Sequence, residues 1–460
     1  MIGLPPFLSF SENERILQLK ILMIILRTVK NISSLNIAAS VLLFLAAILA
    51  AVVANSSLSP VYQDFLLQEL HLRIGNFNLF SHGGHPLKMI DFINECLRTG
   101  FFLAVGLEIK SELLVGELSS VRKAALPFIA ACGGMVVPVV IYALSVASGT
   151  PETRGMAITM ATAIAFSLGV QSLLGKRVPL SLKIFLTAFA VVDDIGGILV
   201  IALFYSADVA YGYLIAAAVL YVFLYYMGKF GVTQKIFFLF FGVIIWYLFL
   251  QSGIHSTISG VILAFVIPAR PRLDAGKYIE RIRDIIGEFP VSKSDNIVLT
   301  NAQIATLKQV ERASDYVISP LQSLEDNLHG AVSFVHLPQI ANAHAGLVKT
   351  GSGSFGVDVR RAVAAGLLLG KFLGIYLFTW LAVKSGVALM PAGMNWKNIA
   401  GVSLLGGIGF TVSLFIANLS FADEYPELLN QAKFGVLVGT VLAGVLGYVV
   451  LNWVLPEREK

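Results

Sequence analysis

Long apolar runs, each close to twenty residues, recur along the whole chain between short polar connections. A run of about twenty apolar residues is what an α-helix needs to cross the hydrocarbon core of a bilayer, so the pattern predicts about twelve membrane-spanning helices. The predicted spans cover residues 35–54, 89–109, 124–146, 156–174, 179–205, 210–227, 236–250, 253–268, 330–347, 362–383, 399–421 and 434–455.

The composition agrees with this pattern. Of the 460 residues, 57% are hydrophobic and 13% are charged, whereas about a quarter of the residues of a soluble globular protein are charged. We therefore predict an all-α, polytopic membrane protein with a transmembrane domain over residues 35–455. Residues 1–34 form a cytoplasmic N-terminal segment, in which the apolar run between Lys20 and Arg27 suggests an interfacial helix. Residues 456–460 form a cytoplasmic tail.

The positions of lysine and arginine indicate the orientation of the spans, because these residues are enriched in cytoplasmic loops. With the N-terminus inside, most basic loop residues fall on the cytoplasmic side, and both termini are cytoplasmic. The exceptions are Arg73, Lys88, Arg154, Lys349, Arg360 and Arg361. The net charge of +5 is therefore a topology signal. It does not indicate binding of nucleic acid, and no glycine-rich loop for a nucleotide is evident.

Two polar regions have a recognisable pattern of their own. Residues 70–80 alternate around Gly75-Asn76, which predicts a small extracytoplasmic β-hairpin. An isolated hairpin is marginally stable, so it pairs with a second subunit or rests on its own loops. The extended cytoplasmic loop at about residues 269–327 contains two helical stripes, and the second opens with the capping-box spacing Thr300 to Gln303.

The most informative polar residues are Asp193 and Asp194, near the middle of the span 179–205. One charged residue at the bilayer centre costs about 2.5–3.5 kcal/mol on insertion scales, and charges at that depth usually pair or serve a function. Lys371, near the centre of the span 362–383, is the best partner. Adjacent helical residues project about 100° apart, so one carboxylate can pair with Lys371 while the other lines an ion cavity. This pattern indicates an ion transporter.

Two spans have sequences typical of broken helices. The fourth is rich in hydroxyl residues around Thr162, and the eleventh contains Gly406, Gly407 and Gly409. Unwound backbone at membrane depth is tolerated only where it lines a cavity or is buried in protein. Glycine-interrupted spans in two halves point to a transporter's binding site. Close helix packing is the alternative explanation for the glycines.

A carboxylate at such a site can exchange one cation for another. Burial raises its pKa and a nearby cation lowers it. If the resulting value lies near neutral pH, Na⁺ and H⁺ compete for the same oxygens. A site that holds either ion and opens alternately to each side of the membrane is an antiporter.

Several motifs resemble the NhaA-type bacterial sodium/proton antiporters. They are Val-Asp-Asp-Ile-Gly-Gly at 192–197, Leu-Gly-Lys ending at 371, Gly-Ile-Gly-Phe-Thr-Val-Ser at 407–413, and the stretches 106–113 and 253–260. The match runs in order from about residue 37 to about residue 454. The resemblance implies Na⁺ (or Li⁺) exchange for H⁺ across the inner membrane by alternating access. It also implies electrogenic, pH-regulated transport that serves sodium and pH homeostasis.

The resemblance also assigns roles to residues. It implies inverted-topology repeats with spans 4 and 11 broken and crossing. Asp194 would be the main ligand for Na⁺ and the proton, Asp193 would pair with Lys371, and Thr162 would line the crossing. The pH-response region at the cytoplasmic side would include His255, Glu108, Glu112 and Glu325. The hairpin around Gly75 and Asn76 would form the contact of a homodimer. For His255 taken alone, a hydrogen-bonded packing role is the favoured explanation, and the glutamates near Lys110 could equally be interfacial residues paired with Lys or Arg.

One departure falls at the proposed site. The family places an acidic residue after the threonine of the fourth span, and here that residue is Ala163. A broken helix directs about half a charge from each end into the break, so the missing carboxylate predicts a weaker affinity for the cation or a shifted pH optimum.

The sequence leaves two alternatives to transport. One is a transport-impaired homologue that acts as a sensor or scaffold. The other is an intramembrane aspartyl protease, but its two aspartates must lie on different elements and share a proton. Here the central pair is adjacent on one helix. We therefore expect no enzyme and no cofactor, with Na⁺ or Li⁺, H⁺ and the lipid bilayer as partners.

Overall fold

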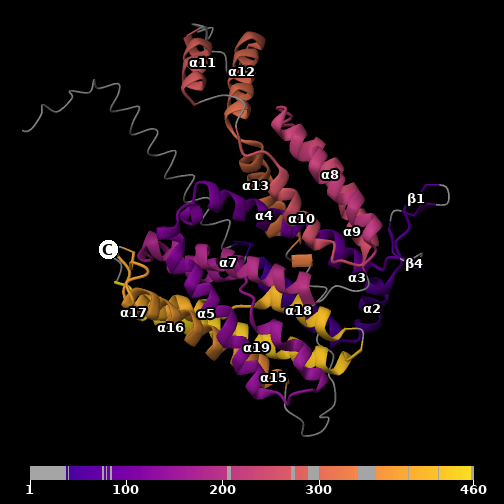
Figure 1. The fold of residues 1–460 in the computed structure, drawn as a ribbon, viewed down its shortest axis with the longest axis vertical. Coiled ribbons are helices and arrows are strands. Elements are labelled where there is room, and N and C mark those ends of the chain that lie inside the picture. The colour runs from indigo at the N-terminus through magenta and orange to yellow at the C-terminus, as the bar shows by residue number, and fades with distance from the viewer. Residues whose placement is uncertain are drawn as a thin grey trace, which may run out of the picture.

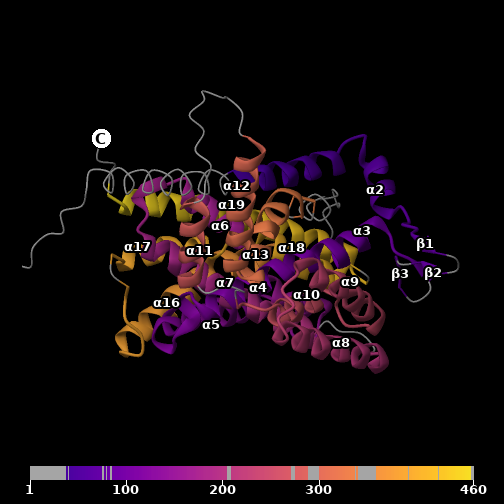
Figure 2. The same cartoon turned by 90° about the horizontal axis from the view of Figure 1, so that it is seen from above.

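The fold is almost entirely helical. The computed structural model describes residues 38–39, 41–74, 77–78, 80–82, 85–204, 209–270, 275–287, 300–336, 338–339, 359–391, 393–422 and 424–456. Figures 1 and 2 place the short strands between Arg73 and Pro86 at one end of the helical body and α17 (Trp396–Leu405) at the other. The predicted N-terminal segment, 1–34, and His344, which stands where the family would have an asparagine, lie outside the described residues.

Six helices are long and apolar enough to cross a membrane, or up to nine spans if each bent pair among the described residues counts as one. The six are α5 (Val121–Ser145), α7 (Leu180–Phe204), α8 (Tyr211–Lys229), α9 (Lys235–Ser252), the run Val359–Lys384 and α19 (Pro426–Val454). The bent pairs are Val41–Ala54 with α2 (Ser59–Leu67), η3 (Pro151–Thr159) with α6 (Ile164–Ser172), and α17 (Trp396–Leu405) with α18 (Phe410–Phe421). The chain is thus a multi-pass membrane protein, but the predicted count of twelve is not confirmed.

Three predicted spans account for the difference. The span predicted at 89–109 is a continuous run of α3 (Met89–Phe92), the π-helical turn η1 (Ile93–Leu97) and α4 (Arg98–Leu114), and it carries several charges. The span predicted at 253–268 contains α10 (Thr257–Val266), whose ten residues are too few to cross a bilayer. Residues 340–347 of the ninth predicted span lie outside the described residues.

The polar regions follow the sequence pattern closely. Helices α11 (Ala275–Gly287) and α12 (Asn301–Val317) form where the two stripes predict them, and they project together from the rest of the molecule in Figure 1. The backbone N of Thr300 donates to Oε1 of Gln303 (2.9 Å), and the backbone N of Gln303 donates to Oγ1 of Thr300 (3.3 Å). The predicted capping box is therefore confirmed.

Short strands occur where the hairpin is predicted. Strands β1 (Arg73–Ile74) and β2 (Phe77–Asn78) pair antiparallel, and so do β3 (Ser81–His82) and β4 (His85–Pro86). The turn residues Gly75 and Asn76 lie outside the described residues, so the hairpin itself stays a prediction.

Buried apolar side chains form two main clusters. The larger cluster joins α5, α7 and the helices from α15 (Val359–Ala365) to α19, and includes Leu186, Leu367 and Ile408. The smaller cluster joins α4, α8, α9, α10 and α13 (Pro320–Ala331), and includes Leu107 and Leu263. The molecule thus has two packed cores, and the polar site described below lies where elements of both meet.

The larger core contains a close helix contact that positions Lys371. A Cβ built on Gly374 of α16 (Lys371–Lys384) would collide with the carbonyl of Gly133 in α5, and the reverse collision also occurs. Small residues let membrane helices approach this closely. Because Lys371 lies one turn before Gly374, this contact fixes the lysine against α5.

We expect Gly374→Val to lower the free energy of unfolding by about 1–3 kcal/mol, because the added methyl groups overpack the contact. The thermal unfolding midpoint in detergent measures this effect. Gly212→Ala in α8 is the matched control, since a Cβ there would meet nothing within 4 Å. An unchanged midpoint for Gly374→Val would contradict the close contact.

Candidate functional site

The interruptions of the two bent spans lie against each other in the interior. The backbone N of Ala163 donates to the carbonyl of Ile408 (2.6 Å), and Oγ1 of Thr162 donates to the carbonyl of Gly406 (2.8 Å). Each pair of half-helices is bent by 45°. Backbone groups freed at one interruption are therefore satisfied partly by the other, which is the condition for non-helical backbone at membrane depth.

The glycines of the eleventh predicted span permit this contact. A Cβ on Gly407 would lie 2.5 Å from the carbonyl of Leu367, and a Cβ on Gly409 would collide with Oγ of Ser413. The next residue, Phe410, begins α18 with a φ of 22°, a value that non-glycine residues rarely adopt. The backbone N of Phe410 donates a hydrogen bond to Oγ1 of Thr440 in α19 (3.2 Å). The strained backbone at this point is thus held by α19, in agreement with a functional constraint.

The two aspartates of α7 are buried and have different neighbours. Nζ of Lys371 donates to Oδ2 of Asp193 at 2.7 Å, and Asp193 and Lys371 are 1% and 0% exposed, respectively. Lys371 begins α16 directly after the π-helical turn η6 (Gly366–Gly370). The pairing that the sequence predicts is therefore present. Asp194, one residue further along the helix, is directed to a separate space.

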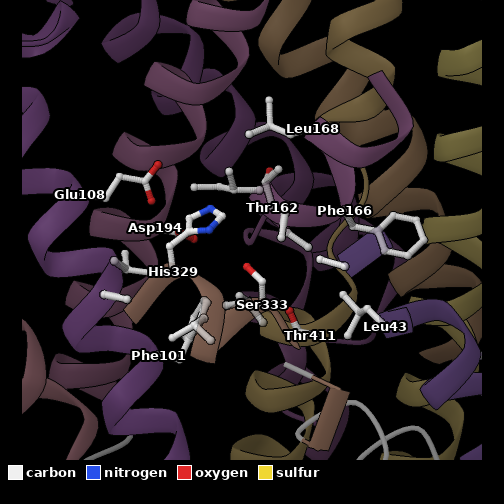
Figure 3. A pocket seen from close by; sticks show the side chains of 18 of the residues that line it. Leu43, Phe101, Glu108, Thr162, Phe166, Leu168, Asp194, His329, Ser333 and Thr411 are labelled. Carbon is white, nitrogen blue, oxygen red and sulfur yellow. The ribbon is translucent and has the colours of Figure 1, made fainter. Parts of the chain in front are cut away.

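Asp194 lines a cavity of about 170 Å³ between the two cores. Figure 3 shows Asp194, Thr162 and Glu108 around this space together with residues from α13 and α18. The side chains with polar atoms that line it are Glu108, Thr162, Asp194, Glu325, His329, Ser333 and Thr411. Ala163 is also in the lining, so the position where the family has a carboxylate faces the same cavity.

Three of these polar residues were not assigned by the sequence. His329 and Ser333 follow Glu325 at intervals of four residues, which places all three on one helical face. That spacing was the signal that could have identified them once Glu325 was chosen. Thr411 belongs to the glycine-containing motif, but nothing in the sequence distinguishes it from the neighbouring Ser413.

The three glutamates assigned to pH response lie together. Glu108, Glu112 and Glu325 are close enough to interact electrostatically, and Oε2 of Glu112 accepts a hydrogen bond from the backbone N of Glu117 (2.9 Å). Burial raises the pKa of Glu325 above its ordinary value, although a hydrogen bond from Ser111 acts in the opposite direction. This cluster meets the cavity through Glu108 and Glu325.

His255, which the resemblance groups with these glutamates, lies apart from them. Its Nδ1 lies 4.0 Å from Oε1 of Glu95, and Glu95 also accepts a hydrogen bond from Oγ of Ser256 (2.6 Å). Glu95 precedes Glu112 by 17 residues, a separation of about 25 Å along a helix. His255 therefore lies near the beginning of the helical run formed by η1 and α4, whereas Glu112 lies near its end.

Arg98, a buried cation of α4, lies near this second group. Its guanidinium carbon is 3.4 Å from the centroid of the Phe415 ring of α18, and Arg98 interacts electrostatically with Glu95. The contact joins α4 to the second half of the eleventh predicted span.

Comparison with known proteins assigns the chain to a family. Residues 30–451 match the family model described as Na⁺/H⁺ antiporter 1. A protein of Bacteroides thetaiotaomicron named Na(+)/H(+) antiporter NhaA is 70% identical over 438 residues, or 95% of this chain and 100% of that protein. Proteins of the same name from Bacteroides fragilis (72% over 437 residues, 95% and 100%) and Phocaeicola vulgatus (58% over 414 residues, 89% and 92%) are also similar. The chain therefore belongs to the Na⁺/H⁺ antiporter 1 family, and it is a multi-pass membrane transporter and not an enzyme.

Proposed function

We propose that this protein exchanges Na⁺ or Li⁺ for H⁺ across the bacterial inner membrane by alternating access. The observation that carries the proposal is that two adjacent carboxylates have different surroundings. Asp193 is bound to Lys371, whereas Asp194 faces a cavity between the two packed cores. A buried carboxylate that has access to an aqueous cavity can hold a cation or a proton, and the two compete for its oxygens.

In this mechanism the ion or proton on Asp194 is the transported species. The fixed charges around it come from Asp193, Lys371 and the ends of the half-helices, each of which directs about half a charge toward the interruption. The Lys371–Asp193 pair keeps the second carboxylate from binding an ion at rest. Release of this pair would open the site, and a net charge would cross the membrane in each cycle.

The cluster of Glu108, Glu112 and Glu325 is the proposed pH-response region at the cytoplasmic mouth of the cavity. Its carboxyls repel one another when ionised, so the charge on one affects the others. We infer that His255 and Glu95 act apart from this cluster, since Glu95 lies in η1, about 25 Å along the helix from Glu112.

The remaining architecture is proposed from the family. It comprises about twelve spans, the number of apolar runs in the sequence that are long enough to cross a bilayer. The spans would form inverted-topology repeats in which the bent pairs η3–α6 and α17–α18 cross. Both termini would be cytoplasmic. A hairpin through Gly75 and Asn76 would pair with a second copy in a homodimer, which agrees with the antiparallel pairing of β1 and β2 on either side of that turn. Exchange would serve sodium and pH homeostasis and would be driven by the ion gradient without a cofactor.

The test is Na⁺-driven proton movement in proteoliposomes at several pH values between roughly pH 6.5 and 9. We expect Na⁺ or Li⁺ added outside to move protons in the opposite direction, and a membrane potential to change the rate. If Na⁺, Li⁺ and K⁺ all fail to drive proton movement at every pH, the proposal is overturned and a transport-impaired sensor or scaffold is favoured.

Ala163 provides a prediction at the site itself. It is the N-terminal cap residue of α6 and offers no side-chain acceptor. Ala163→Asp adds a carboxylate at a helix N-terminus, which should lower the half-saturating Na⁺ concentration by about two- to tenfold. Initial rates in proteoliposomes at several pH values measure this effect. Ala163→Asn is the control without a charge, and an unchanged affinity and pH profile in Ala163→Asp would count against the role given to this position.

A further inference from the structure

The wall of the cavity opposite the interrupted spans carries a hydroxyl that the family motifs do not explain. Ser333 lies in the π-helical turn η5 (Val332–His336), which follows α13. Its side chain is 8% exposed, and it lines the same cavity as Asp194 and Ala163. In Figure 3 its hydroxyl oxygen is directed into the space between Asp194 and Thr411.

The hydroxyl of Ser333 makes no hydrogen bond within the described part of the chain, whereas the hydroxyls of Thr162 and Ser167 do. Oγ1 of Thr162 donates to the carbonyl of Gly406, and Oγ of Ser167 donates to the carbonyl of Leu405 (3.0 Å). A buried polar group without a partner is unfavourable unless something in the cavity satisfies it. Ser333 is therefore available to a cavity occupant, while Thr162 is already engaged.

Local helix geometry explains how Ser333 reaches this position. Glu325, His329 and Ser333 line one face at intervals of four residues. At Val332 the chain changes from α13 to a π-helical turn. Such turns are rare and frequently occur at functional sites. Ser333 is the second residue of this turn and is part of the cavity lining.

We propose that Oγ of Ser333 is a ligand of the cation bound at Asp194 and favours that cation over the competing proton; this inference rests on the proposed function. Hard cations prefer several oxygen ligands that replace their water shell. A proton on Asp194 is held by its covalent bond to one carboxyl oxygen and needs no such shell. An added neutral oxygen therefore stabilises the cation-bound form more than the protonated form. It also partly replaces the side-chain oxygen that Ala163 lacks.

The experiment uses the full-length protein with Ser333→Ala, which removes the oxygen, and Ser333→Cys, which keeps the size but offers a soft sulfur. Ser420→Ala is the matched control: Ser420 is 5% exposed, lies outside this cavity and donates to its own helix at the carbonyl of Ile416. Na⁺ binding is measured by titration calorimetry in detergent at alkaline pH. Half-saturating Na⁺ and maximal rate are measured in proteoliposomes.

We expect both Ser333 variants to bind Na⁺ about three- to tenfold more weakly than wild type, the effect of one lost neutral hydrogen-bonding group. The maximal rate at saturating Na⁺ and the unfolding temperature should stay at the wild-type values. The proton should compete more strongly, so the pH at which transport begins should rise. Ser420→Ala should match wild type in all of these measurements.

Three results would overturn the inference. If both variants bind Na⁺ with wild-type affinity, Ser333 is not a ligand of the cation, and the proposed antiport is unaffected. Loss of folding in both variants would make Ser333 a packing residue. Absence of Na⁺ binding to the wild type would overturn the inference together with the proposed function. By contrast, Na⁺ binding without transport, weakened in both variants, would support the ligand and overturn only the antiport.

Discussion

Asp194→Asn is expected to reduce Na⁺-driven proton movement to the level of protein-free vesicles. The amide has nearly the same shape but carries no charge and cannot release a proton, so both transported species lose their common ligand. Loss of a buried charged partner costs about 2–5 kcal/mol, or about 30- to several thousand-fold in affinity. Asp194 is 6% exposed, and little bulk water is available to substitute for the carboxylate.

The measurement compares wild type and Asp194→Asn in the same proteoliposome assay, with the amount of folded protein checked by size-exclusion chromatography. Asp64→Asn is the matched control, because Asp64 is an exposed carboxylate of α2 that does not line the cavity. It should transport like wild type. Substantial Na⁺-dependent exchange by Asp194→Asn would show that another group carries the ions.

Lys371→Ala is expected to lower the free energy of unfolding by about 3–5 kcal/mol, because it leaves the buried Asp193 without its cation. The 2.7 Å contact joins groups that are 1% and 0% exposed, so solvent cannot replace the lost partner. The thermal unfolding midpoint in detergent should fall clearly. Transport should fall as well, since Asp193 would then be protonated or would compete with Asp194 for the ion.

A double variant separates the charge effect from the loss of packing. Asp193→Asn with Lys371→Met removes both charges and nearly keeps the volume, and such replacements are often neutral or stabilising. We expect the double variant to regain most of the unfolding midpoint but not the transport activity. A wild-type midpoint in Lys371→Ala alone would mean that the pair contributes little to stability.

Much of the site follows from local sequence and from the cost of charge in a membrane. Runs of apolar residues define the membrane helices, and an aspartate pair and a lysine within such runs must find each other because hydrocarbon offers no other partner. Glycines and hydroxyl residues in two spans predicted their interruption, and both helix pairs are bent at those places. The capping box at Thr300 was also predictable, since its hydrogen bonds join residues three apart.

Other features depend on how the helices pack. The resemblance grouped His255 with three glutamates, but the packing of α10 against α4 places the preceding His255 beside Glu95. His329 and Ser333 enter the site only because α13 and η5 lie across the cavity from α7.

The sequence by itself therefore determined the membrane class, the paired charges and the family, because periodicity, charge and motif are properties of single segments. Only the tertiary structure decided which residues line the cavity beside Asp194, that the Ser333 hydroxyl stays unengaged and where His255 lies. Those outcomes depend on the distances between segments far apart in the chain, such as Glu95 and His255, and packing between whole helices sets those distances.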